Sequence, residues 1–249
     1  MTVAFCLLTR EPTPEWLTFL EQVKEVTPFK VMVMCDNTTY KLPEQSSVRI
    51  IQYSDEIVRK TGYKECNVAT GSKDVIAWDK AIFHFCEIEP FYDYVFFVED
   101  DVFIPTPESI LTIHNKYKED LICHCDNGFV EKDKGDINVW HWRHAYGLLN
   151  LPWYASMVCA IRVSNALLQA MKRHVNRINR IPFLEIVWNT LAHQNNLSVK
   201  IIPEFEYIIY DSKSLDYTKY LTYLKNNNWL HPIKESKEHP KIREYISMS

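Results

Sequence analysis

Residues 94–105 read Tyr-Val-Phe-Phe-Val-Glu-Asp-Asp-Val-Phe-Ile-Pro, an apolar run that leads into three consecutive carboxylates, Glu99, Asp100 and Asp101. A continuous apolar run of this length is typical of a strand buried on both faces. Ligands of open α/β sheets bind just beyond the carboxyl ends of such strands. Adjacent carboxylates repel one another unless a cation lies among them, and oxygen ligands favour a hard cation such as Mg2+ or Mn2+. The stretch predicts either a metal site or an acidic turn exposed to water.

The rest of the chain alternates between strand and helix patterns around this run. Thr13 and Pro14, for example, form a helix start directly after an apolar strand. This alternation predicts an α/β fold with a central mixed, mostly parallel sheet flanked by helices. Strands are expected at residues 3–8, 29–34, 48–53, 94–99, 120–125, 157–163, 199–202 and 205–210, with helices beginning near residues 13, 72, 106, 165 and 182.

Length, charge and hydropathy restrict the class of protein. A chain of 249 residues fits one large domain, and we draw no domain boundary because the sequence has no repeats and no low-complexity linker. A net charge of -4 argues against a nucleic-acid partner, which usually calls for a basic excess. There is no apolar window of about 18 residues and no signal-peptide pattern at the start, so we expect no membrane span and a cytoplasmic location.

The seven cysteines are scattered, and their odd number does not suggest a disulfide framework. Cys123, His124 and Cys125 resemble a fragment of a zinc site, but no second Cys/His pair stands at zinc-site spacing. We therefore favour reduced cysteines that pack as small apolar side chains.

Three further segments have weaker patterns. The pattern weakens from residue 54 to residue 72, and we expect the polar stretch between Gly62 and Gly71 to be mobile. Residues 126–155 combine glycines with many aromatic side chains, which indicates either a satellite core or a surface on which sugar rings stack. The tail contains one apolar island at residues 229–234, after which we expect poor order.

Polar residues at the ends of the first two strands add to the acidic run. Thr9 and Arg10 follow the first strand, and Asp36 follows the second, where it is either a ligand contact or part of a turn. Lys80 lies on the helix that precedes the acidic strand. Because parallel strands end at one edge of a sheet, we expect these side chains near Glu99.

With these residues in place, the chain resembles glycosyltransferases of the GT-A type. Glu99-Asp100-Asp101 stands where those enzymes carry a DXD-type motif, and it is most similar to the Glu-Asp-Asp version of N-acetylglucosaminyltransferase I-like enzymes. The resemblance covers residues 1–105 well and the remainder in outline. It implies a nucleotide-sugar-binding half at residues 1–105 and an acceptor-binding half with a C-terminal tail at residues 106–249.

The resemblance also implies roles for single residues. Asp101 would bind Mn2+ or Mg2+, with the late His231 as a further metal or diphosphate contact. Asp36 would accept a hydrogen bond from the N–H of uracil. The remaining nucleotide-sugar contacts would be Thr9, Arg10, Lys80, Glu99, Asp100 and Lys234.

The implied activity is transfer of a hexosyl or pentosyl group from a nucleoside-diphosphate sugar, such as a UDP-sugar, to a hydroxyl of a glycan or other acceptor. An inverting reaction needs a general base, for which we select Glu185, although an acid at a helix start also suits the helix dipole. Asp126, Asp133 and Asp136 are weaker candidates for the base. Two other functions remain open: a non-catalytic sugar- or nucleotide-binding module and a metal-dependent phosphoesterase.

Overall fold

The computed structural model describes residues 1–41, 43, 46–129 and 140–248. Its main feature is a seven-stranded sheet with the order β3-β2-β1-β4-β8-β5-β9. Strand β8 is antiparallel to both of its neighbours, and the other pairs are parallel. The expected mixed, mostly parallel sheet is therefore confirmed. The sheet strands are β1 (Val3–Thr9), β2 (Lys30–Cys35), β3 (Arg49–Ile51), β4 (Tyr94–Glu99), β5 (Leu121–Cys123), β8 (Ala160–Ser164) and β9 (Val199–Ile201).

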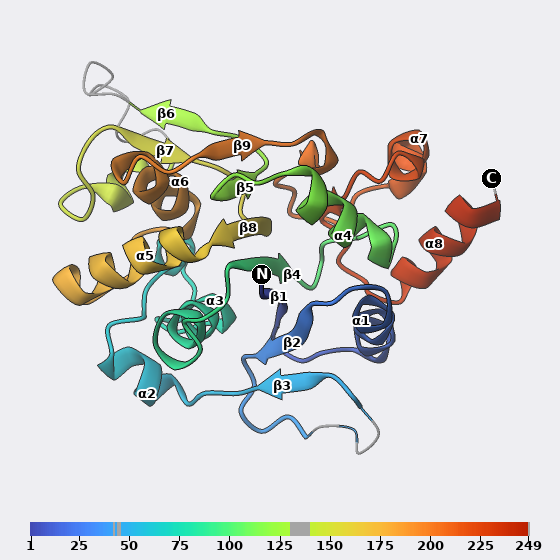
Figure 1. The fold of residues 1–249 in the computed structure, drawn as a ribbon, viewed down its shortest axis with the longest axis horizontal. Helices are drawn as coiled ribbons and strands as arrows, with labels where there is room; N and C mark the ends of the chain where they lie inside the picture. Colours follow the sequence, from blue (N-terminus) through green and yellow to red (C-terminus); the bar gives the residue numbers. More distant parts are fainter. Residues whose placement is uncertain (42, 44–45, 130–139, 249) are drawn as a thin grey trace.

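Helices cover both faces of this sheet (Figure 1). One face carries α3 (Ala77–Phe83), α5 (Asn165–Ile178) and α6 (Leu184–Gln194), whose apolar residues form one core with the sheet. The other face carries α1 (Pro14–Val26) and α4 (Pro107–Lys116), which form the second core. Thr13 and Thr106 cap α1 and α4 through their hydroxyl groups, as the Thr-Pro sequences predict.

The register of the central strands places the predicted site residues at one edge of the sheet. Leu8 of β1 pairs with Glu99 of β4, and Thr9 pairs with Cys35 of β2. Because these three strands are parallel, Thr9, Asp36 and Glu99 all stand at carboxyl ends. The continuous apolar run of β4 is buried between the two layers of helices, as its composition predicts.

Several short elements lie outside the main sheet. Two-stranded pairs join β6 (Asn127–Phe129) to β7 (Trp153–Ala155) and β10 (Tyr207–Ile208) to β11 (Leu230–His231).

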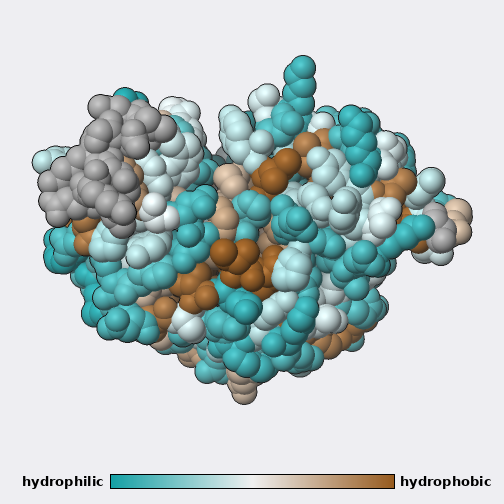
Figure 2. All heavy atoms as spheres, turned by 90° about the horizontal axis from the view of Figure 1, so that it is seen from above, coloured by the Kyte–Doolittle hydropathy of each residue, from teal (hydrophilic) through white to brown (hydrophobic). Residues whose placement is uncertain are grey.

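Figure 2 views the molecule from the side on which β6 and β9 lie in Figure 1, and it shows an apolar area surrounded by hydrophilic surface. No helix within the described residues is long and apolar enough to span a membrane. The remaining helical segments are α2 (Asp55–Lys60), η1 (Val68–Thr70), η2 (His84–Ile88), η4 (Trp142–Ala145), η5 (Pro203–Phe205), η6 (Tyr217–Tyr220), α7 (Leu221–Lys225) and α8 (Glu238–Met248).

One expectation for the weakly patterned segments, the poor order of the tail, is wrong. Where the pattern weakens from residue 54 onward, the structure has α2, which Ser54 caps and which Val58 attaches to the core. The tail contains α8, which buries His239 and Ile242. Arg243 fixes this helix further, because its Nε donates to the carbonyl of Ile104 at 3.0 Å and its guanidinium lies 4.0 Å from the ring of Phe19.

Candidate functional site

The acidic run at the end of β4 is held in place by hydrogen bonds from two tryptophans and a threonine. The Trp78 indole donates to Glu99 Oε1 at 2.6 Å. The Thr9 hydroxyl donates to the Asp100 carboxylate, and the Trp16 indole donates to the Asp100 carbonyl at 2.7 Å. These donors come from α3, β1 and α1, so elements from both sides of the sheet fix the turn after β4.

The third carboxylate, Asp101, faces the C-terminal segment. An isolated bridge between Phe103 and Leu230 brings this segment to the end of β4. Asp101 Oδ1 then lies 3.2 Å from His231 Nε2, and Asp101 Oδ2 lies 2.7 Å from Lys234 Nζ. The amide of Ile233 also donates to the carbonyl of Asp101 at 2.7 Å. The structure thus joins two residues from the tail to the acidic run, although more than 125 residues separate them in sequence.

Burial and mutual repulsion set the protonation of the three carboxylates. Burial raises the pKa of Glu99, and the neighbouring charge of Asp101 raises it further. Burial likewise raises the pKa of Asp100. Burial also acts to raise the pKa of Asp101, but the hydrogen bonds and charges of His231 and Lys234 outweigh it and lower that pKa to about 2. The three carboxylates of this site lie beside one lysine and one histidine.

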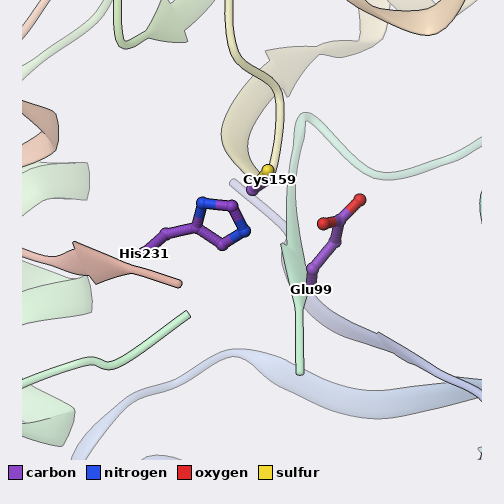
Figure 3. A group of neighbouring side chains, drawn as sticks. All are labelled: Glu99, Cys159 and His231. Carbon is purple, nitrogen blue, oxygen red and sulfur yellow. The ribbon is translucent and has the colours of Figure 1, made fainter. Parts of the chain in front are cut away.

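The donor atoms at this site fit a divalent cation. One ligand atom each from Glu99, Cys159 and His231 lies within 4.8 Å of the other two, and Figure 3 shows the three side chains converging from separate segments. The Asp101 carboxylate stands next to His231 Nε2. A cation bound among these groups would relieve the repulsion between the carboxylates.

Two adjoining cavities lie along the carboxyl ends of β1, β2 and β4. A cavity of about 230 Å3 brings together six of the predicted site residues, and a second of about 430 Å3 shares Arg10 and Asp36 with it. The smaller cavity is lined by Leu8, Thr9, Arg10, Asp36, Ile76, Ala77, Trp78, Glu99, Asp100 and Asp101. The larger one is lined by Arg10, Asp36, Asn37, Thr38, Thr39, Ser54, Asp55 and Lys73.

Lys80 does not line either cavity. Its side chain is fully buried, and its Nζ lies 2.7 Å from Oδ1 of both Asp36 and Asp55. Lys73 approaches the same pair from the cavity side, at 2.8 Å from Asp36 Oδ2. Lys80 therefore fixes the carboxylate of Asp36 from the buried side. The sequence alone did not indicate this ion-pair network.

Glu185, the candidate base, lines a separate cavity of about 360 Å3 in the second half of the chain. Burial raises the pKa of Glu185 to about 7, and the charge of Glu99 adds to this effect. Trp140 and Trp142 line the same cavity, and Trp140 is 43% exposed. The backbone of Trp140 has a strained positive φ of 56°. This cavity combines a carboxylate that titrates near neutrality with exposed indole surface.

The other candidates for the base are less suitable. Asp126 Oδ2 lies 2.7 Å from His193 Nε2, and Asp126 Oδ1 accepts from the Asn189 amide at 2.9 Å. Both of its oxygens are thus engaged. Asp133 and Asp136 lie outside the described residues.

The Cys123-His124-Cys125 segment packs against its surroundings. His124 Nδ1 lies 2.9 Å from the carbonyl of Phe205, and the Cys123 side chain is buried. All seven cysteines are free thiols, and six of them are buried, as expected. The seventh, Cys125, is half-buried and lines the cavity next to Glu185.

Sequence reasoning did not identify Cys159, Trp78, Asp55 and Lys73 as parts of the site. Cys159 directly precedes β8, and the carbonyl of Cys159 accepts from the Glu99 amide at 2.8 Å. The pairing of β8 with β4 creates this proximity, and no local pattern in the sequence predicts that pairing.

Comparison with known proteins supports the fold. No family model matches the sequence, and no curated protein matches it. Among solved structures, the galactosyltransferase LgtC in complex with donor and acceptor sugar analogues is 10% identical, with a TM-score of 0.50 over 98% of this chain and 96% of that one. An active-site mutant of LgtC matches over the same shares at 9% identity. The bifunctional glycosyltransferase WbbM is 9% identical, with a TM-score of 0.51 over 99% of this chain and 51% of that one.

These structural neighbours are glycosyltransferases, and the sheet and its flanking helices match the GT-A arrangement. The chain therefore has the GT-A type of fold. At this level of sequence identity, the comparison defines the class of fold, and the chemistry has to be argued from the site itself.

Proposed function

We propose that this protein is a metal-dependent glycosyltransferase that moves a hexosyl or pentosyl group from a nucleoside-diphosphate sugar, such as a UDP-sugar, to a hydroxyl of a glycan or other acceptor. The observation that carries this proposal is the convergence of Glu99, Asp100 and Asp101 with His231 and Lys234 beside the two cavities at the strand ends. This arrangement combines carboxylates for a cation with a lysine for an anion, which a nucleoside-diphosphate donor requires.

The donor would lie along the strand ends. The larger cavity, with Arg10 and Asp36, would take the base and ribose, and the diphosphate would extend toward Asp101. Mn2+ or Mg2+, held by Asp101 and His231 with Glu99 nearby, would supply Lewis-acid stabilisation of the departing diphosphate. Lys234 is 43% exposed beside Asp101 and would contact a phosphate oxygen.

The acceptor would bind in the cavity next to Glu185. Indole faces pack well against the apolar C–H faces of sugar rings, so Trp140 and Trp142 suit a glycan acceptor. Glu185 would take the proton from the attacking hydroxyl, because a base that titrates near pH 7 is matched to the working pH. With the base on the side opposite the leaving group, the reaction would invert the anomeric centre.

This proposal keeps the two halves expected from the sequence, with donor contacts in residues 1–105 and acceptor contacts in residues 106–249. The tail is an exception, because His231 and Lys234 return to the donor side. The subtype that we propose is N-acetylglucosaminyltransferase I-like, on the strength of the Glu-Asp-Asp triplet, and the proposed location is the cytoplasm.

Two alternatives account for fewer of these features. A binding module would not need Glu185 to titrate near pH 7 in a cavity close to the charge of Glu99. A phosphoesterase with two metal ions would need more carboxylate and histidine ligands than the one donor group that the described residues provide.

The test is to screen a panel of nucleotide sugars for Mn2+-dependent release of nucleotide. We expect turnover with at least one UDP-sugar, and a loss of about 100-fold or more in Asp101→Ala, because several kcal/mol of transition-state stabilisation depend on that carboxylate. Glu25→Ala, on the exposed surface of α1, is the control and should retain wild-type activity. Equal activity in Asp101→Ala and wild type would refute the metal assignment, and hydrolysis of a plain phosphodiester without sugar transfer would favour the phosphoesterase.

A further inference from the structure

Three side chains with different ligand atoms meet at the end of β4. Glu99 provides an oxygen, His231 a nitrogen and Cys159 a sulfur, and these atoms lie within 4.8 Å of one another. Figure 3 shows the imidazole of His231 extending toward Glu99, with Cys159 above it on the segment that leads into β8. Cys159 is 7% exposed, so its side chain is buried and does not lie on the outer surface.

Backbone contacts fix the positions of the three residues. Glu99 and Cys159 are neighbours across the β4–β8 pair, because the Glu99 amide donates to the Cys159 carbonyl at 2.8 Å. His231 is brought to the same point by the bridge between Phe103 and Leu230. The cysteine is therefore part of the framework of the site.

Hydrogen bonds behind the donors orient two of them. His231 Nδ1 lies 2.6 Å from the carbonyl of Ile209, which fixes Nδ1–H as the donor and turns Nε2 toward the carboxylates. The Trp78 indole donates to one oxygen of Glu99 at 2.6 Å, and the Cys159 side chain hydrogen-bonds to the same carboxylate. A backbone carbonyl behind a histidine ring is the usual support of a metal-binding imidazole.

We propose that Cys159, together with Glu99 and His231, forms a binding site for a thiophilic divalent cation such as Zn2+. One oxygen, one nitrogen and one sulfur ligand with an open fourth position match the ligand set of a zinc site. A thiolate ligand favours Zn2+, Co2+ or Cd2+ over Mg2+ and Mn2+. The thiol releases its proton to the solvent when the ion binds.

The geometry requires only a small contraction. Tetrahedral ligands at zinc bond lengths lie about 3.3–3.8 Å apart, whereas the three donors lie within 4.8 Å of one another. Side-chain rotation of Glu99 and Cys159 can supply the difference without a change in the β4–β8 pairing.

This inference adds a ligand and a metal preference to the metal site of the proposed function. It rests on the proposed function only for the position of the ion. Because His231 is shared with Asp101, a thiophilic ion at Cys159 and a hard ion at Asp101 compete for the same imidazole. Zn2+ is therefore expected to displace Mn2+ from this protein.

The test is to titrate the protein with Co2+ and record the near-ultraviolet thiolate-to-cobalt charge-transfer band. The reference protein is Cys125→Ser, which lacks the half-buried thiol of the neighbouring cavity. We expect the band in wild type and in Cys125→Ser. Added Zn2+ should remove the band, and added Mg2+ should leave it unchanged. The double variant that carries both Cys125→Ser and Cys159→Ser should show no band. Co2+ affinity in that double variant should fall by about 10-fold or more.

A second measurement uses only wild-type protein, so it does not depend on whether a variant folds. Wild-type protein is treated with iodoacetamide with and without Zn2+, and the modified cysteines are identified by mass spectrometry. Protection of Cys159 by Zn2+ supports the inference, and equal modification of Cys159 in both samples overturns it. Binding of Co2+ without a thiolate band overturns it as well. Both readouts are independent of sugar transfer, so a failed nucleotide-sugar screen would leave this result unaffected.

Discussion

At the scale of single residues, the site depends on how buried charges are paired. Asp101 is paired with His231 and Lys234, whereas Glu99 and Asp100 accept hydrogen bonds from the neutral donors Trp78 and Thr9, and burial raises the pKa of both. A protein tolerates such an excess of buried negative charge when a ligand neutralises it. This is the physical reason for placing a cation at the end of β4.

Lys80 illustrates the opposite case, a buried charge that is fully paired within the chain. Replacement by Met should destabilise the protein by about 3–5 kcal/mol, because Asp36 and Asp55 would lose their buried cation. Urea unfolding of Lys80→Met against wild type measures this loss, with Lys60→Met on exposed α2 as the control. Equal stability of the two variants would mean that the buried ion pair does not hold Asp36.

Glu185 leads to a prediction about pH. Its pKa is raised to about 7, so the carboxylate becomes the deprotonated base only as the pH rises through that value. The kcat of sugar transfer should therefore increase with pH and level off at or above about pH 7, with the midpoint moved lower by a bound cation.

Glu185→Gln should lose this pH dependence together with about 100-fold or more of kcat. Asp126→Asn, in the same half of the chain, should keep the wild-type profile because Asp126 is already paired with His193. A Glu185→Gln enzyme that retained the rise through pH 7 would exclude Glu185 as the base.

At the scale of elements, the C-terminal segment matters most, because β11 and α8 deliver and anchor two site residues. His239 at the start of α8 packs between the rings of Trp16 and Phe103, at centroid distances of 5.4 and 5.5 Å. Burial lowers the pKa of His239 to about 4. The unfolded chain protonates His239 below its unfolded pKa of about 6.5, whereas the folded chain keeps it neutral down to about pH 4, so stability is lost progressively as the pH falls from about 6.5 to 4.

We therefore expect the free energy of unfolding of wild type to fall, relative to His239→Gln, by about 3 kcal/mol between pH 7.5 and pH 4. Denaturant unfolding at several pH values measures this difference directly. A constant difference between the two proteins across that range would show that His239 does not titrate on unfolding.

Elements with strong local patterns could be predicted from the sequence, and those that depend on tertiary contacts could not. The apolar run of β4 and the Thr-Pro starts of α1 and α4 carry their own signals. In contrast, α2 and α8 are short, charged helices that bury few apolar residues, so their periodicity is weak. Their stability comes from packing, which a single sequence does not display.

The same distinction applies to the site. Glu99, Asp100 and Asp101 are adjacent in sequence, so their common location could be predicted. Cys159 joins them only because β8 is inserted antiparallel beside β4. Lys80 pairs with Asp36 and Asp55 because the fold of α3 against β2 buries its ammonium, and no local pattern in the sequence indicates this pairing.

At the scale of the whole molecule, the GT-A fold has three cavities that fit the proposed donor and acceptor. Two of them lie along the strand ends, and the third lies beside Glu185. The strand ends collect the residues that we propose for donor binding, because β1, β2 and β4 are parallel and terminate together. The second half supplies the cavity beside Glu185 that we propose for the acceptor, and it then returns through β11 to the acidic site.

The most direct test of this account is a calorimetric titration of the protein with UDP in the presence and absence of Mn2+. We predict that UDP binds with measurable heat when Mn2+ is present, and that binding weakens at least about 10-fold without Mn2+ or in Asp101→Ala. If UDP gave no heat with Mn2+, or bound equally well to Asp101→Ala, the acidic end of β4 would not be a nucleotide-sugar site and the proposed function would be wrong.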